Sequence, residues 1–208
     1  MLEQKMLDFA LLGAGWVLWL LVGLSVLCVG VAAERAIYLA MNRSPGGRFE
    51  RALGAFLGGG ERAALETELT AMGGLEARVL LAGLAAHTRN AEAAEGAMAG
   101  TLAFEKLRAE RGLLVIGTVA SNAPFVGLFG TVLGIIKAFR DLSVASAESA
   151  TAVMAGISES LVATAVGLMV AIPAVVLFNA LSRRVKTTAA RVESLGQLVL
   201  SRLRAEAA

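Results

Sequence analysis

Residues 112–136 read GLLVIGTVASNAPFVGLFGTVLGII and contain no charged side chain. Two further apolar runs lie on either side of this stretch in the chain, at residues 9–31 and 149–182. The run at 9–31 would form about 34 Å of helix, which is enough to cross a bilayer core of roughly 30 Å. The run at 149–182 contains one charge, Glu159, and at about 51 Å it is longer than a bilayer requires. The three runs predict an all-α integral membrane protein with three transmembrane helices.

A cleaved secretory signal peptide is the alternative interpretation of residues 9–31. Val31 and Ala33 precede Glu34 in a pattern that permits cleavage. The run is long for the apolar region of a signal peptide, and the charges in the leader MLEQKMLD nearly balance. We therefore prefer a retained transmembrane helix.

The overall composition indicates that lipid surrounds much of the chain. Of the 208 residues, 57% are hydrophobic and 17% are charged, whereas soluble domains are about half apolar and about a quarter charged. A single cysteine, Cys28, excludes a disulfide within the chain, and a single histidine, His87, leaves few ligands for a metal. The net charge of +2, without a basic aromatic surface, fits nucleic-acid binding poorly. We expect no metal, no cofactor, no nucleic-acid partner and no enzyme activity.

The segment between the first two apolar runs has a different character. Glycines interrupt it at residues 46–47, 58–60 and 73–74. Between these breaks apolar residues recur at three- and four-residue spacing, as in ERAALETELTAM, which predicts short amphipathic helices. No glycine run is followed by Gly-Lys-Ser/Thr, so the sequence does not predict a phosphate-binding loop. We expect a small helical domain here.

The placement of the Lys and Arg residues predicts the orientation in the membrane. One cation precedes the first run, ten lie in the following loop, two lie between the second and third runs, and six follow the third. Cations gather on the cytoplasmic side of membrane proteins. We therefore expect the loop and the C-terminus inside, and the N-terminus and the second loop outside.

Glu159 is the strongest single candidate for a functional residue. A carboxylate well inside a bilayer costs roughly 2.5 to 3.5 kcal/mol on insertion scales, and such groups usually face a bundle interior or an aqueous cavity. The neighbours of Glu159 one helical turn away offer no cation, so another helix must pair it, water must hydrate it, or desolvation must keep it protonated. The alternative is that Glu159 lies at the outer interface and simply faces water.

Thr131 and Thr164 are weaker candidates when taken alone. A threonine in an apolar helix commonly donates its hydroxyl to a carbonyl one turn back. Neither hydroxyl titrates near neutral pH, so these residues could line a proton path and hold water while a carboxyl group carries the charge. Thr164 also lies five residues from Glu159, about 140 degrees of helical rotation, so one helix face cannot present both side chains to the same point.

Small residues and prolines in the second and third runs predict how their helices pack. Gly127, Gly130 and Gly134 form a ridge that lets transmembrane helices approach closely. Pro124 and Pro173 are expected to bend their helices and to free backbone carbonyls that neighbouring helices can satisfy. We expect these positions to serve packing within or between protomers.

The segment 121–179 contains SNAPFVGLFGTVLGIIKAF and GISESLVATAVGLMVAIPAVVLFN. It resembles the signature region of the MotA/TolQ/ExbB proton channel family, and most closely its ExbB and TolQ branch. The resemblance rests on APFVGLFGTVLGI around Thr131, on the GIxExLxATAxGL pattern that holds Glu159 and Thr164, and on the AIPAVVxxN run that begins just before Pro173.

The resemblance implies a bacterial inner-membrane protein whose copies, five in the ExbB branch, surround a central pore. Within the pore would lie a dimer of an ExbD- or TolR-like single-span partner with a membrane aspartate. Thr131 and Thr164 match the family's pore-lining threonines, and Glu159 matches its membrane glutamate. Proton flow would drive movement of the partner and do work on envelope proteins of the TonB or TolA kind, with TonB-dependent uptake the preferred system.

The alternatives are the same motor serving Tol-Pal envelope integrity or gliding motility, a non-conducting membrane scaffold, and secondary transport of a solute. Secondary transport is disfavoured because the chain has no internal repeat. The predicted organisation is a periplasmic N-terminus (1–8), a first transmembrane helix (9–31), a cytoplasmic helical loop (32–111), a second transmembrane helix (112–136), a periplasmic hairpin (137–150), a third transmembrane helix (151–180) and a cytoplasmic C-terminal tail (181–208).

Overall fold

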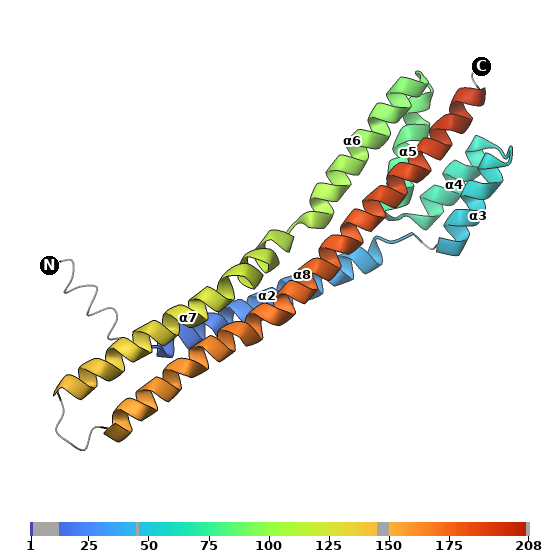
Figure 1. The fold of residues 1–208 in the computed structure, drawn as a ribbon. Helices are drawn as coiled ribbons and strands as arrows, with labels where there is room; N and C mark the ends of the chain where they lie inside the picture. Colours follow the sequence, from blue (N-terminus) through green and yellow to red (C-terminus); the bar gives the residue numbers. More distant parts are fainter. Residues whose placement is uncertain (2–12, 45, 145–149, 207–208) are drawn as a thin grey trace. The chain divides into compact units, whose positions relative to one another are not determined.

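The computed structural model describes residue 1 and residues 13–44, 46–144 and 150–206. Most of the predicted N-terminal segment, the first residues of the predicted first transmembrane helix, and residues 145–149 of the predicted hairpin lie outside the described residues. The helices are α2 (Gly15–Met41), α3 (Gly46–Leu57), α4 (Arg62–Met72), α5 (Gly74–His87), α6 (Ala91–Glu110), α7 (Leu113–Val144) and α8 (Ala150–Glu206), as Figure 1 shows. The all-α class is confirmed.

Three of these helices, α2, α7 and α8, are long and apolar enough to cross a membrane, as the sequence predicts. In their most apolar windows only 22%, 44% and 28% of the helix, respectively, is buried within the protein. Water is a poor solvent for the apolar surface that remains uncovered. Lipid or further protein chains must therefore cover most of it.

The chain folds into two compact units, which we describe separately. Unit 1 comprises residues 1–33 and 112–180, and unit 2 comprises residues 34–111 and 181–208. Helices α2 and α8 each contribute residues to both units.

Unit 1 consists of α7, the first part of α8 and the first part of α2. Helices α7 and α8 run antiparallel and lie side by side (Figure 1). Helix α2 packs against α7, where the rings of Trp16 and Phe129 meet edge to face with centroids 6.2 Å apart. The residues that α2 buries most completely, Val17 and Leu21, are one helical turn apart, as expected for a helix that presents one narrow face to its neighbours.

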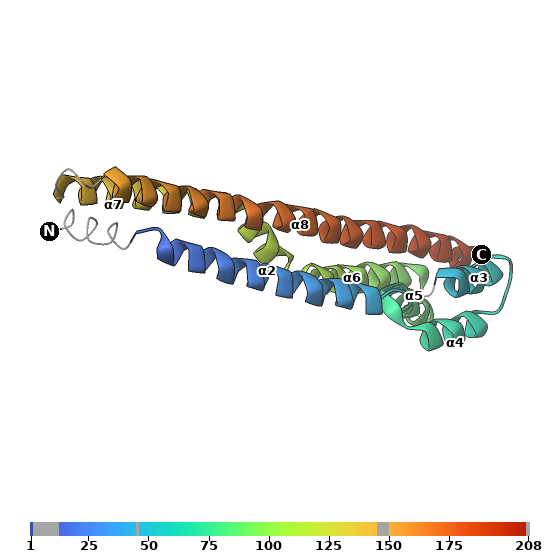
Figure 2. The same ribbon diagram turned by 90° about the horizontal axis from the view of Figure 1, so that it is seen from below.

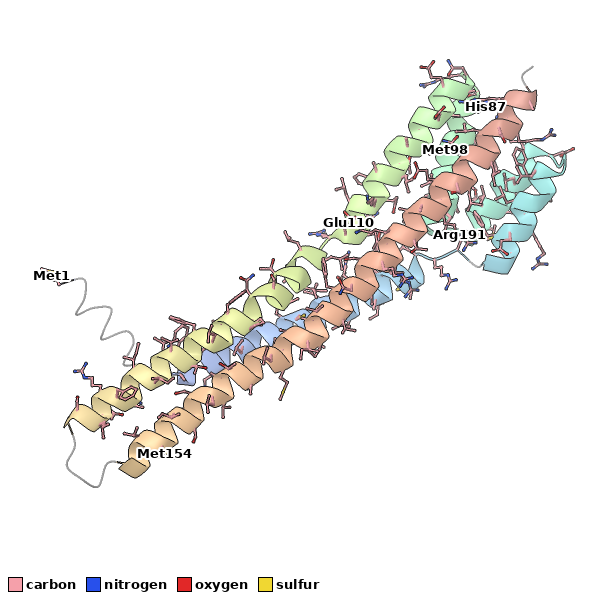
Figure 3. The ribbon with its side chains drawn as sticks, in the orientation of Figure 1. Met1, His87, Met98, Glu110, Met154 and Arg191 are labelled. Carbon is pink, nitrogen blue, oxygen red and sulfur yellow. The ribbon has the colours of Figure 1, made fainter. Side chains whose placement is uncertain are left out.

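Unit 2 gathers α3, α4, α5 and α6 beside the C-terminal part of α8 (Figure 2). Its hydrophobic core is made of Phe49, Leu53, Phe56, Leu65, Leu69, Leu75, Ala77, Val79, Leu80, Leu84, Ala94, Met98, Val192, Val199, Leu200 and Leu203. Met98 of α6, labelled in Figure 3, fills the space left open by Gly83 of α5, and its Sδ lies 3.3 Å from the position that a Cβ at Gly196 of α8 would take. The breaks between α3, α4 and α5 fall at the glycines that the sequence indicates.

Two polar clusters connect the end of α2 to the rest of unit 2. At the first, the Ser44 hydroxyl lies 2.9 Å from a carboxylate oxygen of the buried Glu76. At the second, Arg78 donates to both carboxylate oxygens of the buried Glu105, over 2.9 and 2.8 Å, and to Asn42 Oδ1 over 3.1 Å. These contacts satisfy carboxylates that would otherwise be costly to bury.

Candidate functional site

The contact between α7 and α8 is built from glycines. Gly127 and Gly167 lie opposite each other, and a Cβ at position 127 would be 2.7 Å from the Ala163 carbonyl oxygen and 3.1 Å from the Gly167 Cα. A Cβ at position 167 would be 2.7 Å from the Ala123 carbonyl oxygen. Because the obstructing atoms belong to the backbone, they cannot move aside as a side chain can. The two helices can reach this separation only with glycine at both positions.

The close contact continues along α7 at Gly130 and Gly134. A Cβ at position 130 would lie 2.8 Å from the Ala163 Cβ and 3.0 Å from Val17 Cγ1 of α2, so three helices meet at Gly130. At Gly134 the space is filled by Ser160, whose Cβ would be 2.8 Å from a Cβ at position 134. We call the contact formed by Gly127, Gly130, Gly134 and the facing residues of α8 the α7–α8 seam.

The two prolines lie inside helices that continue on both sides of them. Pro124 is half-buried within α7, one turn before Gly127. Pro173 is exposed within α8. A proline in a helix interior leaves the carbonyl four residues earlier without its helical N–H partner. In α7 this is the carbonyl of residue 120, and in α8 it is the carbonyl of residue 169.

Thr131 and Thr164 meet across the α7–α8 seam. Their hydroxyl groups are hydrogen-bonded to each other, and both residues are half-buried. Thr131 Oγ1 also lies 3.2 Å from the Ser160 carbonyl oxygen of α8 and 3.3 Å from the Gly127 carbonyl oxygen of its own helix. Each hydroxyl has one proton and two lone pairs. If Thr164 donates to Thr131, the Thr131 proton is free to go to a carbonyl, so a directed line of hydrogen bonds crosses between the helices.

Glu159 does not join the threonine pair. Its side chain is exposed and lines a cavity of about 390 Å³ together with Lys137 and Asp141 of α7. Among the described lining residues these three are ionisable; the others are Gly13, Ala14, Gly15, Gly134, Ala138, Ala155, Gly156 and Ser160. The neighbours of Glu159 on its own helix include no cation, but Lys137 of α7 places one in the same cavity.

Ser160 connects the cavity to the threonine pair, and the sequence analysis does not identify it. It is fully buried, its hydroxyl donates to the Gly156 carbonyl oxygen over 2.6 Å, and its own carbonyl oxygen lies within hydrogen-bonding distance of the Thr131 hydroxyl. It also lines the cavity that holds Glu159. The available signal is its spacing, since a polar residue four positions before Thr164 in an apolar run shares the face of that threonine.

The arrangement therefore has two chemically different parts. One is an open cavity with two carboxylates and an ammonium group, and the other is a half-buried pair of hydroxyls that joins two helices. Hydroxyl groups can pass a proton along a chain of hydrogen bonds, and carboxylates can bind and release one. The described residues contain no cluster of three or more His, Cys, Asp or Glu that could hold a metal.

Residues 71–194 match the MotA/TolQ/ExbB proton channel family. A Tol-Pal system protein TolQ of Pseudomonas aeruginosa is 44% identical over 88 residues, which is 42% of this chain and 38% of that protein. A TolQ of Haemophilus influenzae is 54% identical over 70 residues, 34% of this chain and 31% of that protein. A biopolymer transport protein ExbB of Aquifex aeolicus is 49% identical over 74 residues, 36% of this chain and 50% of that protein. The chain thus spans half or less of the length of these relatives.

Proposed function

The chain belongs to the MotA/TolQ/ExbB proton channel family, and from this premise we propose that it is the channel-forming stator subunit of an ExbB–ExbD or TolQ–TolR type motor. Such a motor converts the proton motive force of the inner membrane into mechanical work on envelope proteins. Moving one proton through 100 mV releases about 2.3 kcal/mol, so a few protons suffice for a conformational change.

The observation that carries the proposal is the half-buried hydroxyl pair of Thr131 and Thr164 in the α7–α8 seam. A hydroxyl pair needs no titration of its own, so it can transmit protons to and from a carboxyl group that does titrate. In this proposal that carboxyl group is an aspartate of a single-span partner, and Glu159 shapes the water-filled entry to the path.

The proposed assembly is a ring of several copies, five by analogy with the ExbB branch, around a dimer of an ExbD- or TolR-like partner. The large uncovered apolar surface of α2, α7 and α8 supports association with other chains in the membrane. The proposed orientation, with the N-terminus in the periplasm and the C-terminus in the cytoplasm, rests on the distribution of Lys and Arg.

The test is proton flux in vesicles that contain the complex purified with its partner from its own membranes. We expect Thr131→Val and Thr164→Val to reduce flux to the level of empty vesicles, because valine keeps the shape of threonine and removes the hydroxyl. The matched control is Thr118→Val, since Thr118 is exposed and its hydroxyl donates to the Leu114 carbonyl oxygen of its own helix. Full flux in both seam variants would refute the proposal and favour a non-conducting scaffold.

The downstream system follows from the partner. We propose TonB-dependent uptake first. Tol-Pal envelope integrity stays an alternative because relatives named ExbB and TolQ match to similar degrees, and gliding motility is the other alternative. Native mass spectrometry of the gently extracted complex gives the subunit count and the mass of the co-purified partner in one spectrum. A single copy of this chain without a partner in several detergents would contradict the proposed motor.

A further inference from the structure

The position of Lys137 bears on which ions can enter the cavity. Lys137 lies in the last part of α7, and its exposed side chain lines the cavity that also holds Glu159. A Cβ at Gly13 would lie 3.1 Å from Lys137 Cδ and 3.6 Å from Nζ, so the ammonium group lies close to the backbone that precedes α2. Gly13 has φ +71°, a conformation that glycine adopts readily, and it leaves room for the lysine chain.

The Lys137 ammonium group shares the cavity with two groups of opposite charge. The described lining residues supply two carboxylates, Asp141 and Glu159, and one ammonium group, Lys137. Two carboxylates that share a cavity of about 390 Å³ are the oxygen ligands that metal cations prefer. The Lys137 side chain in the same cavity offsets one of these two negative charges without a metal.

We propose that Lys137 is a tethered counter-cation that occupies the cavity beside Glu159 and Asp141 and thereby excludes sodium and other metal cations from the entrance of the proton path. The inference rests on the proposed function, because it assigns the selectivity of the same path. A sodium ion entering the cavity would have to displace an ammonium group that is covalently attached to the protein. Protons can be passed through water and carboxylates without such a displacement.

The experiment measures proton flux in vesicles that contain the purified complex, with sodium chloride or choline chloride outside at equal ionic strength. The test variant is Lys137→Met, which keeps an unbranched apolar stem and removes the charge; Lys137→Gln repeats the test in case the methionine variant does not assemble. The matched control is Lys137→Arg, which keeps the charge. A second control, Lys137→Met with Asp141→Asn, restores the net charge of the wild-type cavity.

We expect wild-type protein and Lys137→Arg to conduct protons equally well in both salts. The neutral variants should lose up to about fivefold in flux when sodium replaces choline, which is the upper end of the effect expected from removing one solvent-exposed charge beside two of opposite sign. The double variant should lose this sensitivity again.

The inference would be overturned if the neutral variants conducted protons equally well in sodium and in choline. It would also be overturned if sodium reduced the flux of the wild-type protein as much as that of the neutral variants. Both results would leave the proposed function standing. Absence of proton flux through the wild-type complex would overturn the proposed function, and the inference with it. The wild-type measurement in choline therefore separates the two failures.

Discussion

Exchanging the side chains at positions 134 and 160 tests the packing of the α7–α8 seam. At present Ser160 of α8 fills the space that faces Gly134 of α7. A Cβ at position 134 would overlap the Ser160 hydroxyl oxygen and lie 2.8 Å from its Cβ and 3.3 Å from its Cα. The variant Gly134→Ala adds a second side chain to a filled space, and Ser160→Gly empties that space. The double variant again has one side chain in this space, an alanine on α7 in place of the serine on α8.

The expected energies follow from these distances. Gly134→Ala would gain up to about 1 kcal/mol from helix propensity, but overpacking costs roughly 1–3 kcal/mol. Rotation of the Ser160 hydroxyl removes only part of the clash, because the Cβ at 2.8 Å cannot rotate away. We expect a net loss of about 1 kcal/mol in the free energy of unfolding. Ser160→Gly should lose a similar amount, about 1 kcal/mol, from a lost hydrogen bond and a less favourable helix residue.

The double variant should be more stable than the sum of the single variants predicts. With glycine at position 160 the closest atom of that residue to the new Cβ is the Cα at 3.3 Å, which a shift of a few tenths of an ångström accommodates. The interaction energy of the double-mutant cycle should therefore be favourable by about 1–2 kcal/mol.

The assay is unfolding of the detergent-solubilised protein by increasing sodium dodecyl sulfate, followed by tryptophan fluorescence. The two tryptophans, Trp16 and Trp19, both lie in the part of α2 that belongs to unit 1, so the signal reports on that unit. Gly30→Ala is the control, since a Cβ there meets no atom within 4 Å. The reasoning is refuted if Gly134→Ala is as stable as the wild-type protein, or if the energies of the two single variants simply add.

Two further predictions concern unit 2. Glu105→Gln should lower the stability of unit 2 by about 2 kcal/mol, because the partly buried Arg78 guanidinium loses the carboxylate to which it donates two hydrogen bonds. The measurement is thermal melting followed by the helical circular dichroism signal. An unchanged melting temperature would contradict this prediction. The hydrogen bond and the charge of Arg48 lower the pKa of the Glu68 carboxyl from its ordinary value of 4.5, so this pair stabilises unit 2 above that pH and the stabilisation is lost as the pH falls through the lowered pKa. Glu68→Gln should therefore lose less stability on acidification than the wild-type protein, and equal losses in the two proteins would contradict the assignment.

The sequence predicts the membrane-length helices well because a long apolar run with at most one charge can be buried in lipid as a helix. The runs that begin near residues 9, 112 and 149 correspond to α2, α7 and α8. Their ends are harder to predict, because helix formation does not stop where the apolar run stops. Helix α7 continues to Val144 and α8 to Glu206, through segments whose polar residues are good helix formers.

The side chains of the site were predicted by type and only partly by position. Sequence patterns single out Thr131, Thr164 and Glu159, and helical periodicity already separates Thr164 from Glu159 by rotation. It does not show that Thr131 meets Thr164, because that depends on the register of two helices. Neither does it predict Lys137 beside Glu159, because the direction of a long side chain depends on the space that Gly13 leaves open.

The glycines and the hydroxyls of the seam both require a short distance between α7 and α8. Thr131 Oγ1 lies 3.2 Å from the Ser160 carbonyl oxygen, close to the limit of a useful hydrogen bond, so a separation of the helices by about 1 Å would break this contact. That separation is what a side chain at Gly127 would force, because a Cβ there would lie 2.7 Å from a backbone oxygen of α8. The line of hydrogen bonds across the helices therefore exists only because the residues one turn away have no side chains. The proposed proton transfer at the threonines and the packing at the glycines therefore depend on the same interhelical distance.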